Sequence, residues 1–234
     1  MIVLCGGQGT RIRSELGDKL PGVLADVNGR PLLAHVLDQV LKLRPRTVIL
    51  AVGWRGSRVR NAIGKFWRST PVEYSQEARP LGTAGALREA LSRIEKDRSV
   101  LVTYGNSFVD AEGPACTWTT FLKNATAKVV LGASEVSDAA KLTRLVTNAS
   151  GRVIGFPRPT PGRAHVFAGT FCLSYATAQK VQGRDDVDIE LDLFSALMND
   201  EMFAYRLPGP FYSAATPLGL ARTRQYLLNP IYLG

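Results

Sequence analysis

The sequence contains little cysteine and histidine, and this limits the chemistry that it can support. Its 234 residues include three cysteines and two histidines. Cys5, Cys116 and Cys172 show no CxxC spacing and lie in apolar or mixed segments, as buried free thiols do. We therefore expect neither a disulfide framework nor a zinc site. Ser14, Ser107 and Cys5 have no histidine near them in the sequence, so nothing indicates a nucleophilic triad.

Long apolar runs are also missing. No run approaches the roughly 20 residues that a membrane-spanning helix needs. The N-terminus leads from Met1 into a strand-like stretch, without a charged leader or a cleavage site. We therefore expect a cytoplasmic protein. With 45% hydrophobic residues, the chain is long enough to bury one full core, so we expect a single domain over residues 1–234.

Acidic residues are outnumbered by basic ones. Twenty Asp and Glu against 29 Lys and Arg give a formal net charge of +9. This excess favours an anionic partner: a nucleic acid, an acidic membrane surface or a phosphorylated small molecule. The arginines are spread along the chain, without a dense basic tail or an aromatic-interleaved stripe. A phosphorylated small molecule is therefore the expected partner; we expect no membrane partner, and nucleic acid is disfavoured.

The first half alternates apolar, β-rich runs with helical patterns, which predicts a parallel sheet covered by helices. Ligands of such sheets bind beyond the carboxyl ends of the strands, so the chemistry is expected in the loops after Leu4, Val52 and Thr103. The expected strands are 1–4, 47–52, 72–74 and 99–103, and the expected helices lie near 32–43, 57–66 and 84–94.

The second half predicts a change to a mixed sheet. A turn at 148–151 separates two strand-like runs, which indicates a hairpin. The fold class that follows is α/β: a Rossmann-like mixed, mainly parallel sheet with helices on both faces. Strands are expected at 128–133, 142–147, 152–156, 165–173, 203–207 and 211–214, with helices near 176–181, 189–198 and 217–228.

A glycine-rich loop follows the first expected strand. Residues 5–13 read Cys-Gly-Gly-Gln-Gly-Thr-Arg-Ile-Arg, with three glycines, a hydroxyl and two cations. Glycines bring backbone N–H groups close to phosphate oxygens, and arginines add charge-assisted hydrogen bonds. The loop is therefore predicted to bind phosphate groups.

Four segments resemble one enzyme family. Residues 4–13 resemble the LxGGxGTRLR signature of the sugar-1-phosphate nucleotidylyltransferases, and residues 27–32, Val-Asn-Gly-Arg-Pro-Leu, follow at the expected place. Residues 77–86, Glu-Ala-Arg-Pro-Leu-Gly-Thr-Ala-Gly-Ala, resemble the family segment that binds base and ribose. Residues 188–194 resemble its acidic E-x-D-L-F helix. Length and motifs are most similar to small bacterial enzymes that activate heptose 1-phosphate with GTP.

The resemblance implies transfer of a nucleotidyl group from an NTP to a sugar 1-phosphate, heptose 1-phosphate or a similar one. The reaction releases pyrophosphate, forms an NDP-sugar and uses Mg²⁺ or Mn²⁺; a homo-oligomer is also open. The implied catalytic residues are Arg11, Arg13 and Lys19. The implied nucleotide- or substrate-binding residues are Leu4, Gly6, Gly7, Gly9, Thr10, Glu77, Pro80, Gly82, Thr83, Gly85, Asn106 and Glu190. The implied metal ligands are Asn106 and Asp110.

Four positions depart from the family pattern. Gly22 replaces the phosphate-binding lysine of P-K-x-L, and Lys19 is the nearest cation in the sequence. Asn106 and Ser213 replace the two carboxylates that ligate magnesium in the family, and Asn106 keeps a carbonyl oxygen but loses the negative charge. Arg158 stands in the segment that matches F-x-E-K.

Two interpretations of these departures remain open. In the first, the protein is an active transferase with a rearranged metal site that uses Asp110, Asp26, Asp188 or Asp192. In the second, it is a catalytically weak paralogue that binds a nucleotide or an NDP-sugar and regulates or pairs with an active enzyme. A nucleic-acid-binding protein, suggested by charge alone, is third. The base and the sugar are not fixed by the sequence.

Overall fold

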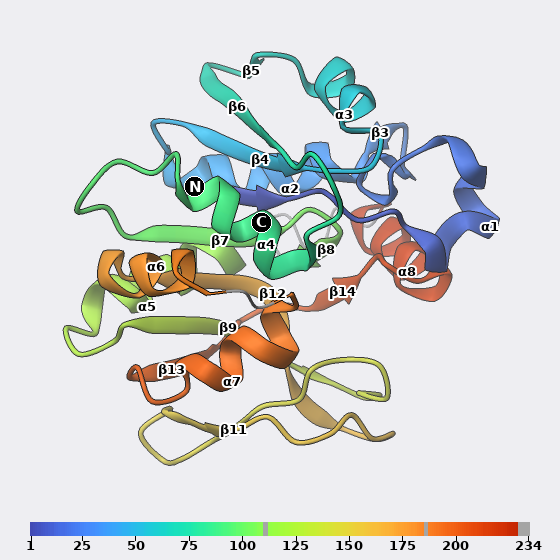
Figure 1. The fold of residues 1–234 in the computed structure, drawn as a ribbon. Helices are drawn as coiled ribbons and strands as arrows, with labels where there is room; N and C mark the ends of the chain where they lie inside the picture. Colours follow the sequence, from blue (N-terminus) through green and yellow to red (C-terminus); the bar gives the residue numbers. More distant parts are fainter. Residues whose placement is uncertain (110–111, 185–186, 229–234) are drawn as a thin grey trace.

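The computed structural model describes residues 1–109, 112–184 and 187–228. Its centre is an eight-stranded sheet with the order β13-β9-β12-β7-β1-β4-β6-β5 (Figure 1). The strands in this order are β13 (Met202–Arg206), β9 (Val129–Val136), β12 (Ala164–Leu173), β7 (Val100–Tyr104), β1 (Ile2–Leu4), β4 (Val48–Val52), β6 (Thr70–Gln76) and β5 (Phe66–Trp67).

The sheet is parallel from β7 through β1 and β4 to β6, and antiparallel pairs flank this part on both sides, at β12 and at β5. Strand β1 pairs in parallel with β4 and β7, and β4 pairs in parallel with β6. Strand β12 is antiparallel to β7 and β9, whereas β13 is parallel to β9. The carboxyl ends of β1, β4, β6 and β7 therefore meet at one edge.

Helices cover both faces of the sheet. On one face, apolar residues of α4, α6 and α7 pack with Ile2, Ile49 and Phe171. On the other, α2 and α3 pack with Val3 and Leu50, and α5 packs against β9 and β12. The helices are α1 (Arg13–Leu16), α2 (Leu32–Val40), α3 (Gly56–Ile63), α4 (Gly82–Leu91), α5 (Gly113–Lys123), α6 (Tyr175–Gln182), α7 (Phe194–Leu197) and α8 (Pro217–Leu228).

Three short antiparallel ribbons lie outside the main sheet. One of them, β8 with β14, aligns Ser107 with Ser213 and extends the chain beyond β7. The ribbons are β2 (Asp26–Val27) with β3 (Arg30–Pro31), β8 (Ser107–Val109) with β14 (Phe211–Ser213), and β10 (Val146–Thr147) with β11 (Val153–Gly155).

The predicted fold class is confirmed, and the hairpin at 148–151 joins β10 to β11 as expected. Helix α5 was not predicted, because residues 113–123 begin with Gly-Pro and contain three threonines, which have weak helix propensity. Burial of Thr117 and Phe121 compensates for that weakness. The expected strand 142–147 is reduced to Val146–Thr147.

The cysteines are free thiols: Cys5 and Cys172 are buried and Cys116 is half-buried. Burial raises the pKa of all three thiols above the usual value. In the described part of the chain, no helix has the length and apolar character required to cross a bilayer.

Candidate active site

A cleft of about 470 Å³ lies where the carboxyl ends of the parallel strands meet. Residues from the loops after β1, β4, β6 and β7 line it, so the predicted location beyond these strands is confirmed. The predicted residues that line the cleft are Leu4, Gly6, Gly7, Gly9, Thr10, Arg11, Glu77, Pro80, Gly82, Thr83, Asn106 and Glu190.

Four predicted residues are not placed in the cleft. Arg13 and Lys19 are exposed on the turns after the glycine loop and do not line it. Asp110 lies outside the described residues. Gly85 is buried in α4, and a Cβ there would collide with the Cβ of Leu81. Glycine therefore lets Leu81 lie against the helix, and the role of Gly85 in approaching the nucleoside stays a prediction.

The glycine loop is held by a close contact between two backbones. Gly9 has a φ of 65°, in the left-handed region, and a Cβ there would lie 3.0 Å from the backbone nitrogen of Gly22. Within the described residues, the N–H groups of residues 6–10 donate to no backbone carbonyl. Arg11 follows at the cleft. This arrangement can bind a polyphosphate through backbone N–H groups and one guanidinium.

Glu77 lies against the glycine loop. Its Oε2 accepts a hydrogen bond from the backbone N–H of Leu81 at 3.1 Å. Its Oε1 lies 3.2 Å from the position that a Cβ on Gly6 would take, and a Cβ on Gly53 would collide with it. Burial raises the pKa of the Glu77 carboxyl above its usual value, although the Leu81 N–H lowers it in part. The carboxylate therefore brings a hydrogen-bond acceptor to the wall of the cleft.

The start of α4 is fixed to the segment before α7. Gly82 has a φ of 75°, and a Cβ there would collide with the carbonyl oxygen of Val187. The backbone N–H of Ile189 donates to Thr83 Oγ1 at 3.0 Å, and Thr83 Oγ1 lies 3.4 Å from Asp188 Oδ2. Both Gly82 and Thr83 line the cleft, so packing between distant segments sets this part of its wall.

Residues Ile189–Leu193 form a π-helix whose first turn is capped by acidic side chains. Asp188 Oδ1 accepts from the N–H groups of Glu190 and Leu191 at 2.8 and 2.9 Å. Asp192 Oδ2 accepts from the N–H of Asp188 at 3.0 Å. Of the aspartates considered as metal ligands, Asp188 and Asp192 therefore bond to backbone groups, although Asp188 also lines the cleft, and Asp26 is exposed on β2 and does not line it.

Glu190 is the acidic side chain of this helix that lines the cleft. Tyr104 and Thr143 hydrogen-bond to its carboxylate. Burial nevertheless raises the pKa of Glu190 above its usual value, and the nearby Asp188 adds to this. Arg11, which follows the glycine loop, lies near enough to lower the pKa of Glu190 in part. Glu190 thus presents a positioned carboxyl group to the cleft.

Asn106 and Ser213 come together at the β8–β14 ribbon. Ser213 pairs with Ser107 in the β8–β14 ribbon, and the N–H of Ala214 donates to the backbone oxygen of Asn106 at 3.0 Å. Both side chains line the cleft. No group of three His, Cys, Asp or Glu side chains in the described residues is placed to hold a metal ion. An amide and a hydroxyl do not match the carboxylate-rich donor set that Mg²⁺ prefers.

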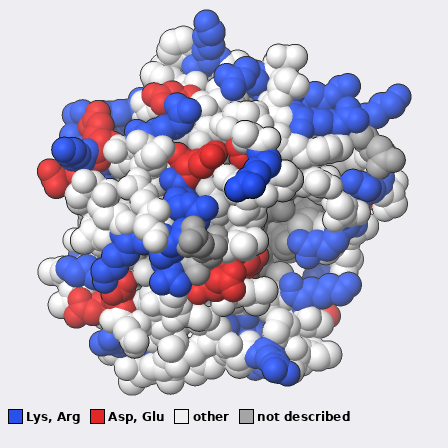
Figure 2. All heavy atoms as spheres, in the orientation of Figure 1, with Lys and Arg blue, Asp and Glu red and all other residues white. Residues whose placement is uncertain are grey.

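Two cations line the cleft within the described residues: Arg11 and Lys141. Lys141 was not predicted, because it lies in a loop without a motif. Two features order this loop. Asp138 Oδ1 accepts a hydrogen bond from the backbone N–H of Ala140 at 3.0 Å, and Ala139 is fully buried. Over the face shown in Figure 2, Lys and Arg form several separate groups with acidic and uncharged residues between them.

Tyr104 and Gly169 also line the cleft and were not predicted. Tyr104 ends β7, so its position at a carboxyl edge was a usable signal. Gly169 has a φ of 74° where the pairing of β12 with β9 shifts, and a Cβ there would lie 2.5 Å from Ser107 Oγ. A lone glycine in an apolar strand is the sequence signal for such a bulge.

Comparisons with known proteins identify relatives. Residues 1–107 match the family model of the MobA-like NTP transferase domain. Over 111 residues the chain is 33% identical to the D-glycero-alpha-D-manno-heptose 1-phosphate guanylyltransferase of Campylobacter jejuni. The chain is related to the sugar nucleotidyltransferases. Over 106 residues it is 42% identical to the bifunctional protein GlmU of Halorhodospira halophila.

These sequence matches are partial. The first covers 47% of this chain and 49% of the Campylobacter enzyme, and the second covers 45% of this chain and 21% of GlmU. The chain therefore spans about half the length of the first relative and about a fifth of the second. The structural likeness extends further, to 97% of this chain and 98% of HddC from Yersinia pseudotuberculosis, with a TM-score of 0.81 and 21% identity.

HddC complexed with GMP-PN superposes with a TM-score of 0.78. At this identity the likeness shows a shared fold. The resemblance to the sugar-1-phosphate nucleotidylyltransferases, which residues 4–13 and 77–86 predicted, is confirmed by the sequence relatives.

Proposed function

We propose that this chain transfers a nucleotidyl group from an NTP to a sugar 1-phosphate, heptose 1-phosphate or a similar one. The observation that supports this most directly is the cleft, whose wall combines a glycine loop and Arg11 with Lys141 and Glu190. The relatives named as sugar-phosphate nucleotidyltransferases support it independently.

The reaction joins two anionic substrates. A phosphate oxygen of the sugar phosphate attacks the α-phosphorus of the NTP; the new P–O bond forms as the bond to the β-phosphate bridging oxygen breaks, and pyrophosphate leaves with that electron pair. Catalysis then consists mainly of alignment and of neutralising negative charge. The N–H groups of residues 6–10 and Arg11 bind the triphosphate, and Lys141 binds the phosphate of the sugar.

Glu190 is the proposed sugar-binding residue. An ionised carboxylate only accepts hydrogen bonds, so it selects sugar hydroxyls that donate. Tyr104 and Thr143 hold its orientation. A sugar with two neighbouring hydroxyls in this part of the cleft satisfies both carboxylate oxygens.

Glu77 supports GTP as the preferred nucleotide. The base edge that complements a carboxylate offers two adjacent donors, and guanine provides these as N1–H and N2–H₂. Glu77 Oε1 faces the cleft wall beside Gly6. The guanylyltransferase of Campylobacter is consistent with this choice.

The described residues do not fit a protein-held Mg²⁺ ion, so no step of this proposal passes through one. Divalent-metal dependence remains a prediction from the resemblance, with the metal entering on the triphosphate or with Asp110 as a ligand. A cytoplasmic location, a single domain over residues 1–234 and a homo-oligomer likewise remain predictions.

The test is pyrophosphate release with each of the four common NTPs and a panel of hexose and heptose 1-phosphates, with Mg²⁺ and with Mn²⁺. We expect release with GTP and one sugar phosphate. Thermal-shift binding of the same NTPs is measured in parallel. Binding without release under every condition contradicts the transferase and supports the alternative, a nucleotide- or NDP-sugar-binding paralogue, which the paired Asn106 and Ser213 favour.

Lys141 supplies a sharper test of how the substrates are arranged. We expect Lys141→Gln to raise the KM for the sugar phosphate about tenfold while the KM for the NTP stays within about twofold, because one charge-assisted contact is lost. Lys128→Gln, an exposed lysine outside the cleft, is the matched control. An equal rise in both KM values contradicts the assignment of Lys141 to the sugar phosphate.

A further inference from the structure

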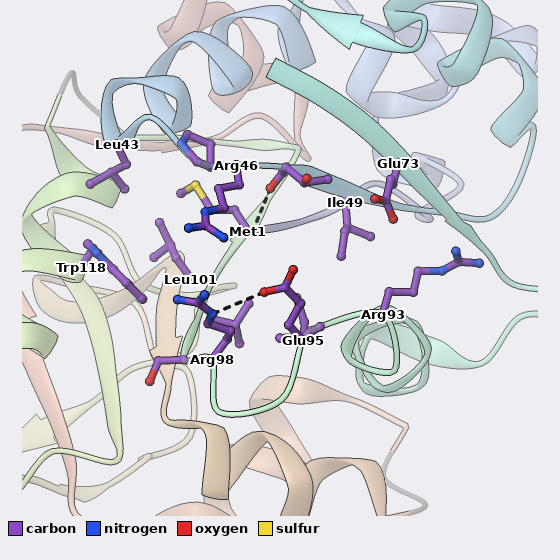
Figure 3. A pocket seen from close by; sticks show the side chains of 15 residues that line it. Met1, Leu43, Arg46, Ile49, Glu73, Arg93, Glu95, Arg98, Leu101 and Trp118 are labelled. Atoms are coloured by element: carbon purple, nitrogen blue, oxygen red, sulfur yellow. Dashed lines mark hydrogen bonds and ion pairs between the residues drawn. The ribbon is translucent and has the colours of Figure 1, made fainter. Parts of the chain in front are cut away.

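A second cavity, of about 340 Å³, lies at the opposite edge of the main sheet (Figure 3). It is lined by Ile49 near the start of β4 and by Val100 and Leu101 at the start of β7. The carboxyl ends of the same strands border the cleft. The two cavities therefore lie at opposite ends of these strands, and the second takes no part in the proposed reaction.

The inner wall of this cavity is apolar and includes an aromatic ring. Ile49 and Leu101 are almost fully buried, and Leu43 and Trp118 are partly buried beside them. The Trp118 ring stacks on Phe121 with 5.8 Å between the ring centroids, which fixes its plane. A fixed, partly exposed indole is a surface on which a flat aromatic ring binds.

The rim of the cavity is predominantly cationic. Arg46, Arg93 and Arg98 line it, against Glu73 and Glu95. Arg98 pairs with Glu95 at 3.4 Å, whereas Arg46 and Arg93 form no ion pair with a carboxylate among the described residues. Figure 3 shows Arg46, Arg98 and Trp118 on one side of the cavity, and Arg93 and Glu73 on the other.

We propose that this cavity binds a nucleoside phosphate, with the base against Trp118 and the phosphate between Arg46 and Arg98. The aromatic wall matches a base, and guanidinium groups bind phosphate through paired, charge-assisted hydrogen bonds. The volume lies within the range of small-molecule sites, roughly 300 to 1,000 Å³. The ribose then faces Glu95, whose carboxylate accepts from its hydroxyls.

This site is independent of the proposed function, because it uses none of the residues of the cleft. It also differs in kind from the cleft: no glycine loop takes part, and side chains alone make the contacts. A failure to detect pyrophosphate release would therefore not count against the proposed nucleoside phosphate site.

The test is isothermal titration of the full chain with GMP, AMP, UMP and CMP, with ribose 5-phosphate as a probe that lacks a base. We expect at least one nucleoside monophosphate to bind the Arg11→Gln variant at 1:1 stoichiometry, and ribose 5-phosphate to bind at least about tenfold more weakly. Adding Arg46→Gln and Arg98→Gln is expected to weaken this binding at least about tenfold, since both contacts to the phosphate are lost.

The matched control replaces Lys42 and Arg44 by glutamine in the Arg11→Gln variant. It removes the same charge from two exposed residues nearby that do not line the cavity. We expect it to bind as the parent variant does. Equal weakening of binding in the two double replacements would show unspecific attraction by net charge. The proposal is overturned if the Arg11→Gln variant binds no nucleoside monophosphate. It is also overturned if binding is unchanged after the loss of Arg46 and Arg98. Since all four replaced residues are exposed, the variants are expected to fold, which circular dichroism checks.

Discussion

Two parts of the cleft wall differ in the groups that form them: the glycine loop and the region around the β8–β14 ribbon. At the glycine loop, backbone groups and one arginine line the wall, and Gly9 and Gly22 hold the loop through main-chain contact. At the β8–β14 ribbon, the family's carboxylates are replaced by Asn106 and Ser213, and side chains from later in the chain line the wall. Residues 1–107, which match the family model, supply the first part.

This contrast teaches that the nucleotide-binding part depends on the shape of the main chain, whereas the acceptor-binding part depends on individual side chains. A backbone site tolerates few substitutions: a Cβ on Gly6 would lie close to Glu77, and Gly9 has a positive φ and a close contact with Gly22. A side-chain site can exchange one charged group for another from a different segment. Lys141 and Glu190 are such groups in this chain.

The largest effect that tests this contrast is expected from Arg11→Gln. Loss of the one arginine that lines the nucleotide-binding part should lower kcat/KM for pyrophosphate release by about two to three orders of magnitude. Arg13→Gln is the matched control, because Arg13 lies outside the cleft, and should stay within about threefold of the parent chain. Equal losses in the two variants would instead support a direct role for both arginines.

A second effect concerns the backbone of α4. Gly82→Ala combines a strained φ with a collision against Val187, and should lower the free energy of unfolding by about 2 to 4 kcal/mol. Gly29→Ala is the control, since Gly29, in the turn between β2 and β3, has a φ of 80° but open space where a Cβ would lie; it should lower the free energy of unfolding by about 1 kcal/mol. Chemical denaturation measures both. Similar losses of unfolding free energy in the two variants would mean that the contact with Val187 does not fix Gly82.

A third test restores charge to the acceptor-binding part. The double change Asn106→Asp and Ser213→Asp places two carboxylates side by side and should raise Mg²⁺-dependent turnover about tenfold or more. Asn61→Asp with Ser69→Asp adds the same charge at exposed positions away from the cleft and should change turnover little. No gain from the restored pair would show that this part works without carboxylate-bound metal.

The smallest effect is a pH dependence of stability at Glu190. Its pKa is raised in the folded chain by burial, so folding disfavours the charged form. The resulting destabilisation is absent below the unfolded-state pKa and grows as pH rises through the folded-state pKa. Glu190→Gln should therefore be more stable, relative to the parent chain, near neutral pH than at acidic pH, as denaturation at several pH values measures. An unchanged difference across pH would contradict the raised pKa.

Much of the first half was predictable because its signals are local. The strands around 2–4, 48–52 and 100–104 are short apolar runs, and the glycine loop follows directly from the first of them. The place of the cleft then follows from strand direction alone. The predicted residues of the loop and of residues 77–83 line the cleft for this reason.

The second half was less predictable because its contacts are distant in sequence. Residues 138–145 contain no motif that predicts the position of Lys141 and Thr143 at the cleft. The sequence around Asp188 likewise does not distinguish a helix-capping residue from a metal ligand. Helix α5 forms against its own weak propensity because the sheet buries it. Such features depend on tertiary packing.

Because Ile189–Leu193 form a π-helix, the number of residues in this segment determines the orientation of Glu190 in the cleft. A π turn closes its hydrogen bonds over i→i+5 and so holds one more residue than an α turn. Deleting Leu191 would relax the turn and rotate Glu190 by about 100° relative to α7, away from Tyr104 and Thr143. Evolution of this cleft can therefore proceed by gain or loss of a single codon as well as by substitution.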